Sequence, residues 1–210
     1  MKTLVFDTSS IISLVTNDLL WILKPLKDKF NGDFYISEHV RNEVIDVPLR
    51  TKKFKFEAMV ILEAIRKNEI KIFKDQIREK TDRLMFLANH IYIAKNEYMQ
   101  IMHLGELESL ALANYLKADA YVIDERTTRM LIESPKKLAI LFQSKLHTRV
   151  GINIRNLRDF QREVGKIDII RSCDLLTIAY ELGLLDKYLI NKDMKKQLLD
   201  GVLWALKLKG

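Results

Sequence analysis

The stretch LVFDTSS (residues 4–10) decides how the chain folds. Its apolar residues Leu4, Val5 and Phe6 predict a buried strand, and Asp7 marks the end of that strand. A buried carboxylate without a partner is costly, so Asp7 needs one. Two interpretations are open: Asp7 caps the helix that follows, as Asp does well, or it is one ligand of a functional site.

This strand is the first of an alternating series. Further apolar runs predict strands at 33–37, 69–73, 120–124 and 150–154. The segments between them predict helices over 9–15 (extending toward 23), 37–47, 56–67, 76–102, 106–117, 126–133 and 136–147. Pro48 is expected to stop the second of these helices. Such alternation predicts an α/β fold, a three-layer α/β/α sandwich around a central parallel sheet of about five strands.

A chain of 210 residues can bury one substantial core. We expect a domain over 1–155 and a helical C-terminal extension over 156–210, with helices at 156–164, 173–183 and 193–208. Because no flexible linker separates the two parts, the extension is expected to pack on the same domain. The segment 193–208 is amphipathic, so it is expected either to pack on the core or to form the face of a homodimer.

Composition excludes several classes of protein. Hydrophobic residues make up 48% and charged residues 30%, and no apolar run is long enough to span a membrane. The chain begins directly with a strand, so we expect no signal peptide and a cytoplasmic location. The single cysteine, Cys173, can form neither an internal disulfide nor a zinc site alone, and its apolar surroundings predict a buried structural thiol. No glycine-rich phosphate loop is present, so a nucleotide-dependent enzyme is not expected.

The net charge of +7 suits a polyanionic partner such as RNA or DNA. Two groups of basic residues are candidates for contacts with a nucleic-acid backbone. One is RTKKFKF (50–56), in which Lys52 and Lys53 are interleaved with aromatic residues. The other is Arg126 and Arg129, which follow closely after Asp124. A solvated charged face is an equally weighted alternative for both groups.

A second strand ends as the first one does. Asp124 closes YVID as Asp7 closes LVFD. Because the carboxyl ends of parallel strands meet at one edge of a sheet, the two acids are expected at the same edge. For either acid alone, helix capping is the favoured interpretation, and the repeated ending adds support for a shared site.

Helical periodicity adds two more acids. Glu43 falls at the border of an apolar stripe, where a carboxylate needs a cationic partner or a metal. Glu106 follows Gly105 in the first turn of its helix and faces inward, whereas Glu108 is expected to face solvent. A surface position for Glu43 and a helix-dipole role for Glu106 are the simpler alternatives.

Four acids at one sheet edge repel one another unless a cation lies among them. Hard oxygen ligands favour Mg²⁺ or Mn²⁺ over zinc. Such a site suits phosphodiester hydrolysis, in which the metal activates water and stabilises charge on the phosphate. The sequence therefore predicts a metal-dependent phosphodiesterase.

Four segments, taken in order, resemble the PIN-domain nucleases: LVFDTSSIISL, SEHVRNEVID, LGELESLALA and YVIDERTTR. The resemblance covers about residues 1–155 and is closest to prokaryotic, especially archaeal, members. It implies a catalytic and metal-binding quartet of Asp7, Glu43, Glu106 and Asp124, with the hydroxyl of Thr8 or Ser9 orienting Asp7 or a metal-bound water. It also implies a Mg²⁺- or Mn²⁺-dependent endoribonuclease, and an antitoxin partner if the chain is one of the family's VapC-like toxins.

The length of 76–102 and of 156–210 departs from the compact toxin pattern, so a role in RNA processing is an equal alternative. Whether the substrate is RNA or single-stranded DNA is also open. A second hypothesis is a catalytically silent RNA-binding or assembly protein on the same scaffold. The four acids favour the nuclease, because a silent protein has no need of them.

Overall fold

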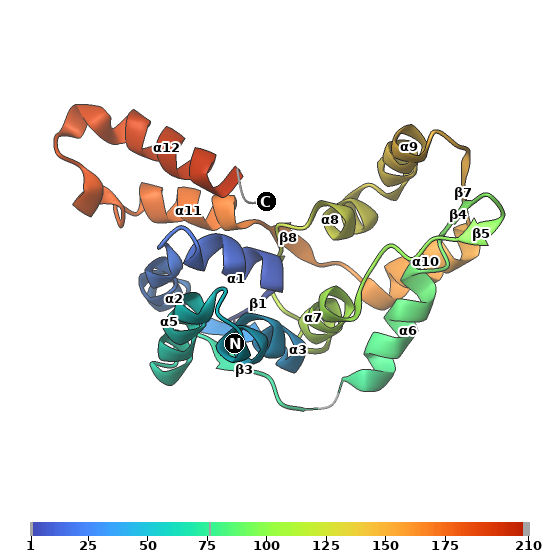
Figure 1. Cartoon of the computed structure of the whole chain (residues 1–210), viewed down its shortest axis with the longest axis horizontal. Helices are drawn as coiled ribbons and strands as arrows, with labels where there is room; N and C mark the ends of the chain where they lie inside the picture. Colours follow the sequence, from blue (N-terminus) through green and yellow to red (C-terminus); the bar gives the residue numbers. More distant parts are fainter. Residues whose placement is uncertain (1, 76, 208–210) are drawn as a thin grey trace.

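The centre of the molecule is a parallel β-sheet with helices on both faces (Figure 1). The structure is a computed structural model that describes residues 2–75 and 77–207. In this part of the chain, five parallel strands pair in the order β3–β2–β1–β6–β8. Their bounds are Lys2–Phe6 (β1), Gly32–Ile36 (β2), Lys71–Ile72 (β3), Ala120–Val122 (β6) and Asp168–Ile170 (β8). The predicted three-layer α/β/α sandwich is confirmed.

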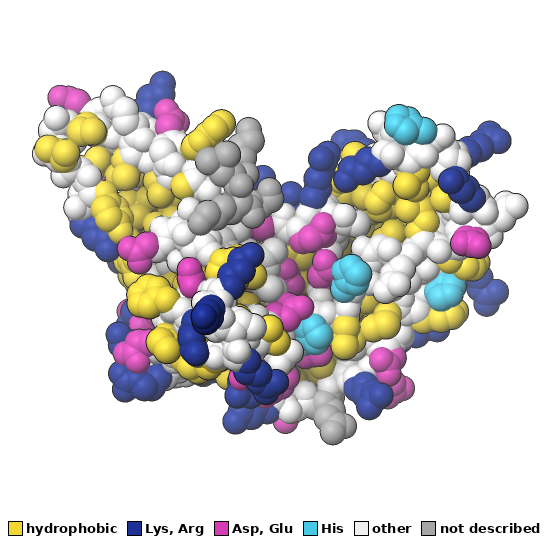
Figure 2. Space-filling view, viewed as in Figure 1, with side chains coloured by type: hydrophobic (Ala, Val, Ile, Leu, Met, Phe, Trp, Pro, Cys, Tyr) yellow, Lys and Arg dark blue, Asp and Glu magenta, His cyan; other side chains and the backbone are white. Residues whose placement is uncertain are grey.

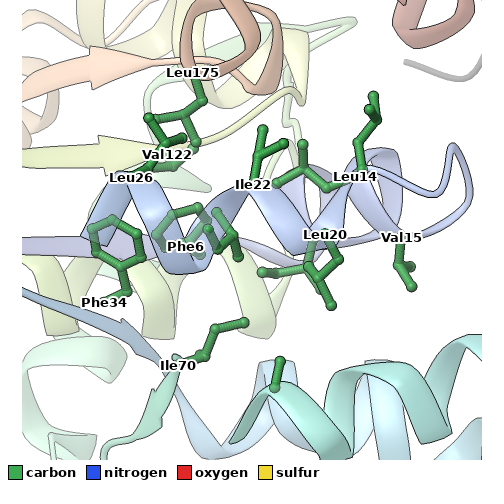
Figure 3. Packing of buried hydrophobic residues seen from close by; sticks show 14 of the residues in the cluster. Phe6, Leu14, Val15, Leu20, Ile22, Leu26, Phe34, Ile70, Val122 and Leu175 are labelled. Carbon is green, nitrogen blue, oxygen red and sulfur yellow. The ribbon is translucent and has the colours of Figure 1, made fainter. Parts of the chain in front are cut away.

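Alternating side chains of the strands divide the interior into two cores. Leu4 and Phe6 of β1 point into one core, and Val5 points into the other, as a pleated strand requires. The first core is shown in Figure 3, where Phe6 and Phe34 lie together under the helices; their ring centroids are 5.3 Å apart. The strands are therefore apolar on both faces, which is typical of a parallel sheet covered on both sides.

Different helices cover the two faces of the sheet. The first core is covered by α1 (Thr8–Val15), α2 (Leu23–Phe30), α3 (Glu38–Arg41), α5 (Lys55–Arg66), α11 (Ser172–Glu181) and α12 (Lys195–Lys207). The second is covered by α6 (Arg78–Ala88), α7 (Leu104–Tyr115), α8 (Arg126–Glu133), α9 (Pro135–Leu146) and α10 (Ile154–Val164). In Figure 1 the α11–α12 pair and the region around α9 form two arms on opposite sides of the centre.

The fifth strand of the sheet is not the predicted one. The run at 150–154 does form a strand, β7 (Val150–Ile152), but β7 pairs antiparallel with β4 (Tyr92–Ala94) in a separate small sheet. The edge position beside β6 belongs to β8, a strand of three residues that the sequence analysis missed. An apolar run shows that a strand forms but does not identify its partner. The segment after residue 155, expected to be helical, thus also supplies a strand of the central sheet.

The predicted helix over 76–102 is wrong in its second half. Helix α6 ends at Ala88, and Asn89 accepts hydrogen bonds from the backbone N–H groups of Ile101 and Met102 at 2.8 and 3.0 Å. The chain between forms a hairpin of β4 and β5 (Glu97–Tyr98). Its turn places Lys95 and Asn96 at φ values of 51° and 67°, the left-handed backbone that tight hairpin turns need. Lys-Asn is a weak turn signal, which explains the error.

Helix α1 ends at the predicted Val15, without the extension toward 23, whereas the helix end predicted at Pro48 is wrong. Helix α1 stops at Val15, and a 3₁₀ turn at Leu20–Ile22 leads into α2. Pro48 does not end a helix but occupies the first turn of α4 (Val47–Arg50), where its missing N–H is tolerated. Residue 76 of the predicted helix 76–102, residue 208 of 193–208 and the extension's last residues, 209–210, lie outside the described residues. None of the helices in the described ranges combines the length and apolar character that a bilayer crossing requires.

Candidate functional site

The site lies where the strand order of the sheet reverses. From β1 the chain moves outward to β2 and β3, and then returns to place β6 on the other side of β1. Ligand sites of open α/β sheets form at such a switch point, beyond the carboxyl ends of the strands. Asp7 follows β1 directly, and Asp124 comes two residues after β6. The backbone N–H of Asp7 donates to the Val122 carbonyl at 2.9 Å, which joins the two strand ends.

Asp7 is the buried member of the site. It is 3% exposed and is the N-cap residue of α1, where its Oδ2 accepts from the backbone N–H of Ser9 at 3.0 Å and from the Ser9 hydroxyl at 2.7 Å. Burial raises the pKa of Asp7, and the nearby Glu43 raises it further, against the lowering effect of the Ser9 bonds. The capping interpretation is therefore correct, and it accounts for only one of the two carboxylate oxygens.

Glu43 approaches Asp7 from the neighbouring helix. It lies in a π-helical turn, Asn42–Asp46, a rare conformation that is frequent at functional sites. The Thr8 hydroxyl donates to Oε2 of Glu43, and Nε2 of His39 lies 3.3 Å from Oε1. Glu43 is thus held by two side chains while 40% of its own side chain is exposed to solvent. The Thr8 hydroxyl thus donates to Glu43, and the Ser9 hydroxyl donates to Asp7.

Gly105 allows α7 to approach this helix closely. A Cβ at position 105 would lie 2.7 Å from Cδ2 of His39 and 3.4 Å from Oε2 of Glu43. Gly105 is the second residue of α7, whereas the sequence predicted that it precedes the helix. Its lack of a side chain brings Glu106, the next residue, to the edge of the same cluster.

Glu106 is held at the N-terminus of α7. Its Oε2 accepts from the backbone N–H of His103 at 2.7 Å, as in a capping box. Burial raises the pKa of Glu106 to about 7, and the negative charges of Glu125 and Asp7 add to the rise. A carboxylate with this pKa is half-protonated near neutral pH and gains from any cation placed beside it.

Tyr121 lies beneath Asp7 and Glu106. Its side chain is fully buried, and its hydroxyl donates to the backbone carbonyl of Glu106 at 3.3 Å. Burial raises the pKa of Tyr121, and the charges of Asp7 and Glu106 raise it further. Asp7, Glu43 and Glu106 therefore form one electrostatically coupled cluster, which we call the carboxylate cluster.

Asp124 points away from this cluster. Its Oδ1 accepts from the backbone N–H of Ser172 at 2.8 Å and its Oδ2 from the Ser172 hydroxyl at 2.7 Å, at the start of α11. Its backbone N–H donates to the Ser9 hydroxyl at 3.0 Å, so Ser9 links it to Asp7. The structure thus brings three of the four expected acids together and places the fourth beside them with its carboxylate bonded elsewhere.

The basic residues differ in how they face the site. Arg126 is exposed at the start of α8, whereas Arg129 is half-buried and lines a pocket of about 370 Å³ that also contains Asp124 and Arg171. Lys52 and Lys53 are exposed in the bend before α5. Figure 2 shows Lys and Arg side chains over α8 and α9, with Asp and Glu side chains below them, near the base of the hollow between the two arms.

Sequence reasoning missed several participants. His39 bonds Glu43. Glu125 adds negative charge near Glu106 and also caps α8, accepting from the N–H groups of Thr127 and Thr128. Glu108 is not a free solvent-facing acid, because its Oε1 accepts from the backbone N–H of His39 at 3.1 Å. The SEHVRNE helix carried one signal, since His39 and Glu43 are one helical turn apart.

The single thiol takes no part in the carboxylate cluster. Cys173 is half-buried, packs against the first core and lines the pocket beside Asp124. Burial raises the pKa of its thiol, which disfavours the reactive thiolate. This agrees with a structural role, although the residue is less buried than the sequence suggested.

The donor set fits a hard divalent cation in its chemistry, because the cluster offers carboxylate oxygens that burial and mutual repulsion destabilise. It is not assembled as a finished cage: no group of three or more His, Cys, Asp and Glu residues in the described part of the chain is placed to hold a metal ion. Neither a scan against protein-family models nor a search of curated proteins found a match to the chain.

Proposed function

We propose that the chain is a Mg²⁺- or Mn²⁺-dependent endoribonuclease related to the PIN-domain family. The observation that carries the proposal is the carboxylate cluster at the switch point of the sheet. Asp7 is buried and Glu106 is half-buried, and the pKa values of both are raised by desolvation and by neighbouring negative charge. A protein retains such a destabilised pair where the charges have a function, and a divalent cation is the partner that relieves the repulsion.

Asp7, Glu43 and Glu106 would hold the cation. When bound, it would supply an activated water and charge stabilisation for hydrolysis of a phosphodiester bond. The chain's own groups prepare this site: Ser9 fixes the carboxylate of Asp7, Thr8 and His39 fix that of Glu43, and the backbone N–H of His103 fixes that of Glu106. These contacts keep the three acids near one another and so limit how far each would move to reach a shared cation.

A polyanionic substrate is supported by charge. The chain carries 35 Lys and Arg residues against 28 Asp and Glu residues, and basic side chains occupy the rim over α8 and α9 (Figure 2). Arg126 is exposed and close in sequence to Asp124, so it is the first candidate for a phosphate contact. The exposed Lys52 and Lys53 and the half-buried Arg129 are further candidates. Such contacts attract a nucleic-acid backbone without reading its sequence.

One observation favours the silent alternative. Both carboxylate oxygens of Asp124 are bonded to Ser172, so this acid is occupied by the fold itself. In a silent RNA-binding protein all four acids would serve as caps and links of this kind. The two functions differ in metal binding, because only the nuclease needs Mn²⁺ to bind at the carboxylate cluster.

The test compares the wild type with Asp7→Asn, Glu43→Gln and Glu106→Gln. Each substitution keeps the shape of the side chain and removes its charge. We expect Mn²⁺-dependent cleavage of a fluorescent single-stranded RNA to fall by at least about 100-fold in each variant. Calorimetric titration with Mn²⁺ should show the same loss of binding, which separates a metal site from a contaminating nuclease.

Asp46→Asn is the matched control. Asp46 ends the same π-helical turn as Glu43 but pairs with Arg41, so its substitution should leave cleavage and Mn²⁺ affinity as in the wild type. Equal cleavage by the wild type and Asp7→Asn would refute the nuclease. RNA binding without Mn²⁺ binding would support the silent alternative. A DNA strand of the same sequence in a parallel assay decides between RNA and single-stranded DNA.

A further inference from the structure

An exposed set of aromatic rings lies where α6, β5 and α10 meet. Phe86 and His90 stack with ring centroids 4.4 Å apart and planes 26° apart, and Tyr98 follows His90 at 4.7 Å. Phe86 is 52% exposed and Tyr98 50% exposed, so a large part of two rings faces solvent. We call these three residues the aromatic ledge.

The ledge is held by bonds that leave its outer faces free. Nδ1 of His90 lies 2.7 Å from the Phe86 carbonyl, which fixes the ring as a donor at that nitrogen. Asn156 donates to the His90 carbonyl at 2.9 Å, and Asn153 donates to the Tyr98 hydroxyl at 3.4 Å. The rings are thus preorganised from behind, which lowers the entropy cost of binding a planar ligand.

The ledge borders a hollow of about 530 Å³ that also includes Gln100 and Asn89. This hollow shares Asp82 and Met85 with a second one of about 480 Å³ that reaches Leu104 and Glu108, at the N-terminus of α7. The backbone from Gln100 to His103 also leads from the ledge toward the N-terminus of α7, and three residues span at most about 11 Å. The N–H of His103 bonds Glu106, so the chain that leaves the ledge reaches the carboxylate cluster within a few residues.

Charges of both signs lie near the ledge: Asp82 lines its hollow, and two arginines lie on α10, the helix that holds it. Arg155 is exposed and lies between Asn153 and Asn156, the two residues that bond the ledge, and Arg158 is exposed one turn further along α10. Within residues 2–75 and 77–207, neither arginine forms an ion pair with an acidic side chain. Exposed rings next to free cations and an open groove are the features with which proteins bind single-stranded nucleic acids, where bases stack on aromatic rings.

We propose that Phe86, His90 and Tyr98 form a base-stacking site for a single-stranded nucleic acid whose backbone continues to the carboxylate cluster. The proposal extends the proposed nuclease by naming where unpaired bases bind. It accounts for an aromatic stack that the described fold leaves half-exposed. Because stacking tolerates any base, the site selects unpaired strands over duplexes rather than a particular sequence.

The test measures binding without catalysis. Fluorescence anisotropy in EDTA compares a labelled oligothymidylate with an abasic oligomer of the same length, which keeps the phosphates and lacks the bases. The wild type should bind oligothymidylate at least about fivefold more tightly than the abasic oligomer. Tyr98→Leu and Phe86→Leu should each remove most of this preference and leave the affinity for the abasic oligomer unchanged.

Tyr115→Leu is the matched control, because Tyr115 is also exposed (57%) and in contact with another ring, but lies at the far end of α7. It should bind both probes as the wild type does. Tyr98→Trp keeps an aromatic ring and should retain the base preference, which covers the case in which a leucine variant unfolds.

Equal affinity of the wild type for the two probes, or an unchanged preference in Phe86→Leu and Tyr98→Leu, overturns the stacking site. The nuclease proposal is scored apart from this result, since Mn²⁺-dependent cleavage by the wild type and its loss in Asp7→Asn need no base preference. If the wild type cleaves RNA but shows no base preference, only the stacking-site proposal is rejected. If it shows base preference but no cleavage, only the nuclease proposal is rejected.

Discussion

Gly105 packs directly against the imidazole ring of His39. A Cβ on Gly105 would lie 2.7 Å from Cδ2 of His39, so any larger residue at position 105 must displace the ring. This contact sets the distance between the helix of Glu43 and that of Glu106. The first prediction concerns the free energy of unfolding. Gly105→Ala should lower it by about 1–3 kcal/mol, because overpacking outweighs the gain in helix propensity.

The double variant His39→Ala/Gly105→Ala is the control for this contact. Once the imidazole is removed, the alanine at position 105 meets no ring, and Gly105→Ala should become neutral or stabilise by up to about 1 kcal/mol. Urea denaturation of the four proteins in the cycle measures the coupling. If the cost of Gly105→Ala is the same in both backgrounds, the contact with His39 does not govern the approach of the two helices.

Asp7 should reduce stability in the absence of metal. Burial and Glu43 raise its pKa, so the charged form is disfavoured in the folded protein. Asparagine is an equally good N-cap and carries no charge. Asp7→Asn should therefore raise the melting temperature in EDTA at neutral pH, whereas Asp7→Ala, which loses the cap, should lower stability by about 1 kcal/mol relative to Asp7→Asn. A lower melting temperature for Asp7→Asn than for the wild type would show that the charge itself stabilises the fold.

Glu106 predicts a pH dependence of stability. Its pKa rises from an ordinary 4.5 to about 7 on folding, so the folded state binds more protons than the unfolded state between these values. Its contribution is fully present below pH 4.5 and is lost as the pH rises through 7, a change of about 1–2 kcal/mol because solvent screens this half-buried group. Denaturation in EDTA across this range should show the loss, and Glu106→Gln should flatten that part of the profile. An identical profile for the variant would place the titration elsewhere.

Asp33 predicts the opposite pH dependence of stability, because its pKa is lowered on folding. It is 6% exposed; burial alone would raise its pKa, but hydrogen bonds from Lys71, at 2.7 Å, and from Lys27 outweigh burial and lower it. Its carboxylate therefore stabilises the fold above its ordinary pKa of 3.8, and this contribution is lost as the pH falls through the lowered value. Asp33→Asn should cost about 1–3 kcal/mol at pH 7, because it removes the carboxylate that two lysines share, although Lys27 keeps its bond to the Asn68 carbonyl. The difference from the wild type should narrow in acid; a constant difference would indicate lost packing instead.

The sequence predicted those parts of the site that local patterns determine. An apolar run closed by an acid located Asp7 and Asp124 at strand ends, and helical periodicity placed Glu43 and Glu106 on faces that meet the sheet edge. These inferences depend on repeats of two or 3.6 residues, which the backbone geometry fixes within each element. They did not need the identity of any distant partner.

The rest depends on contacts between distant segments. The carboxylate of Asp124 turns to Ser172, 48 residues away, because β8 brings the start of α11 beside β6. Likewise Glu108 bonds the backbone of His39 across 69 residues. Nothing in the local pattern of either acid indicates these partners, since an exposed and a bonded carboxylate look alike on a helical wheel. The fifth strand was misassigned for the same reason.

The last prediction follows from β8. The sequence suggested a domain that ends at residue 155, yet β8 pairs with β6 along Ala120–Val122, and α11 covers the first core with Leu175, Leu176 and Ala179. A chain of residues 1–155 would leave the edge of β6 unpaired and expose this apolar surface, so it should aggregate or lack cooperative unfolding. A chain of residues 1–185 keeps β8 and α11 and should unfold cooperatively at a lower melting temperature than the full chain. Cooperative unfolding of 1–155 with native near-ultraviolet circular dichroism would show instead that the last strand is dispensable.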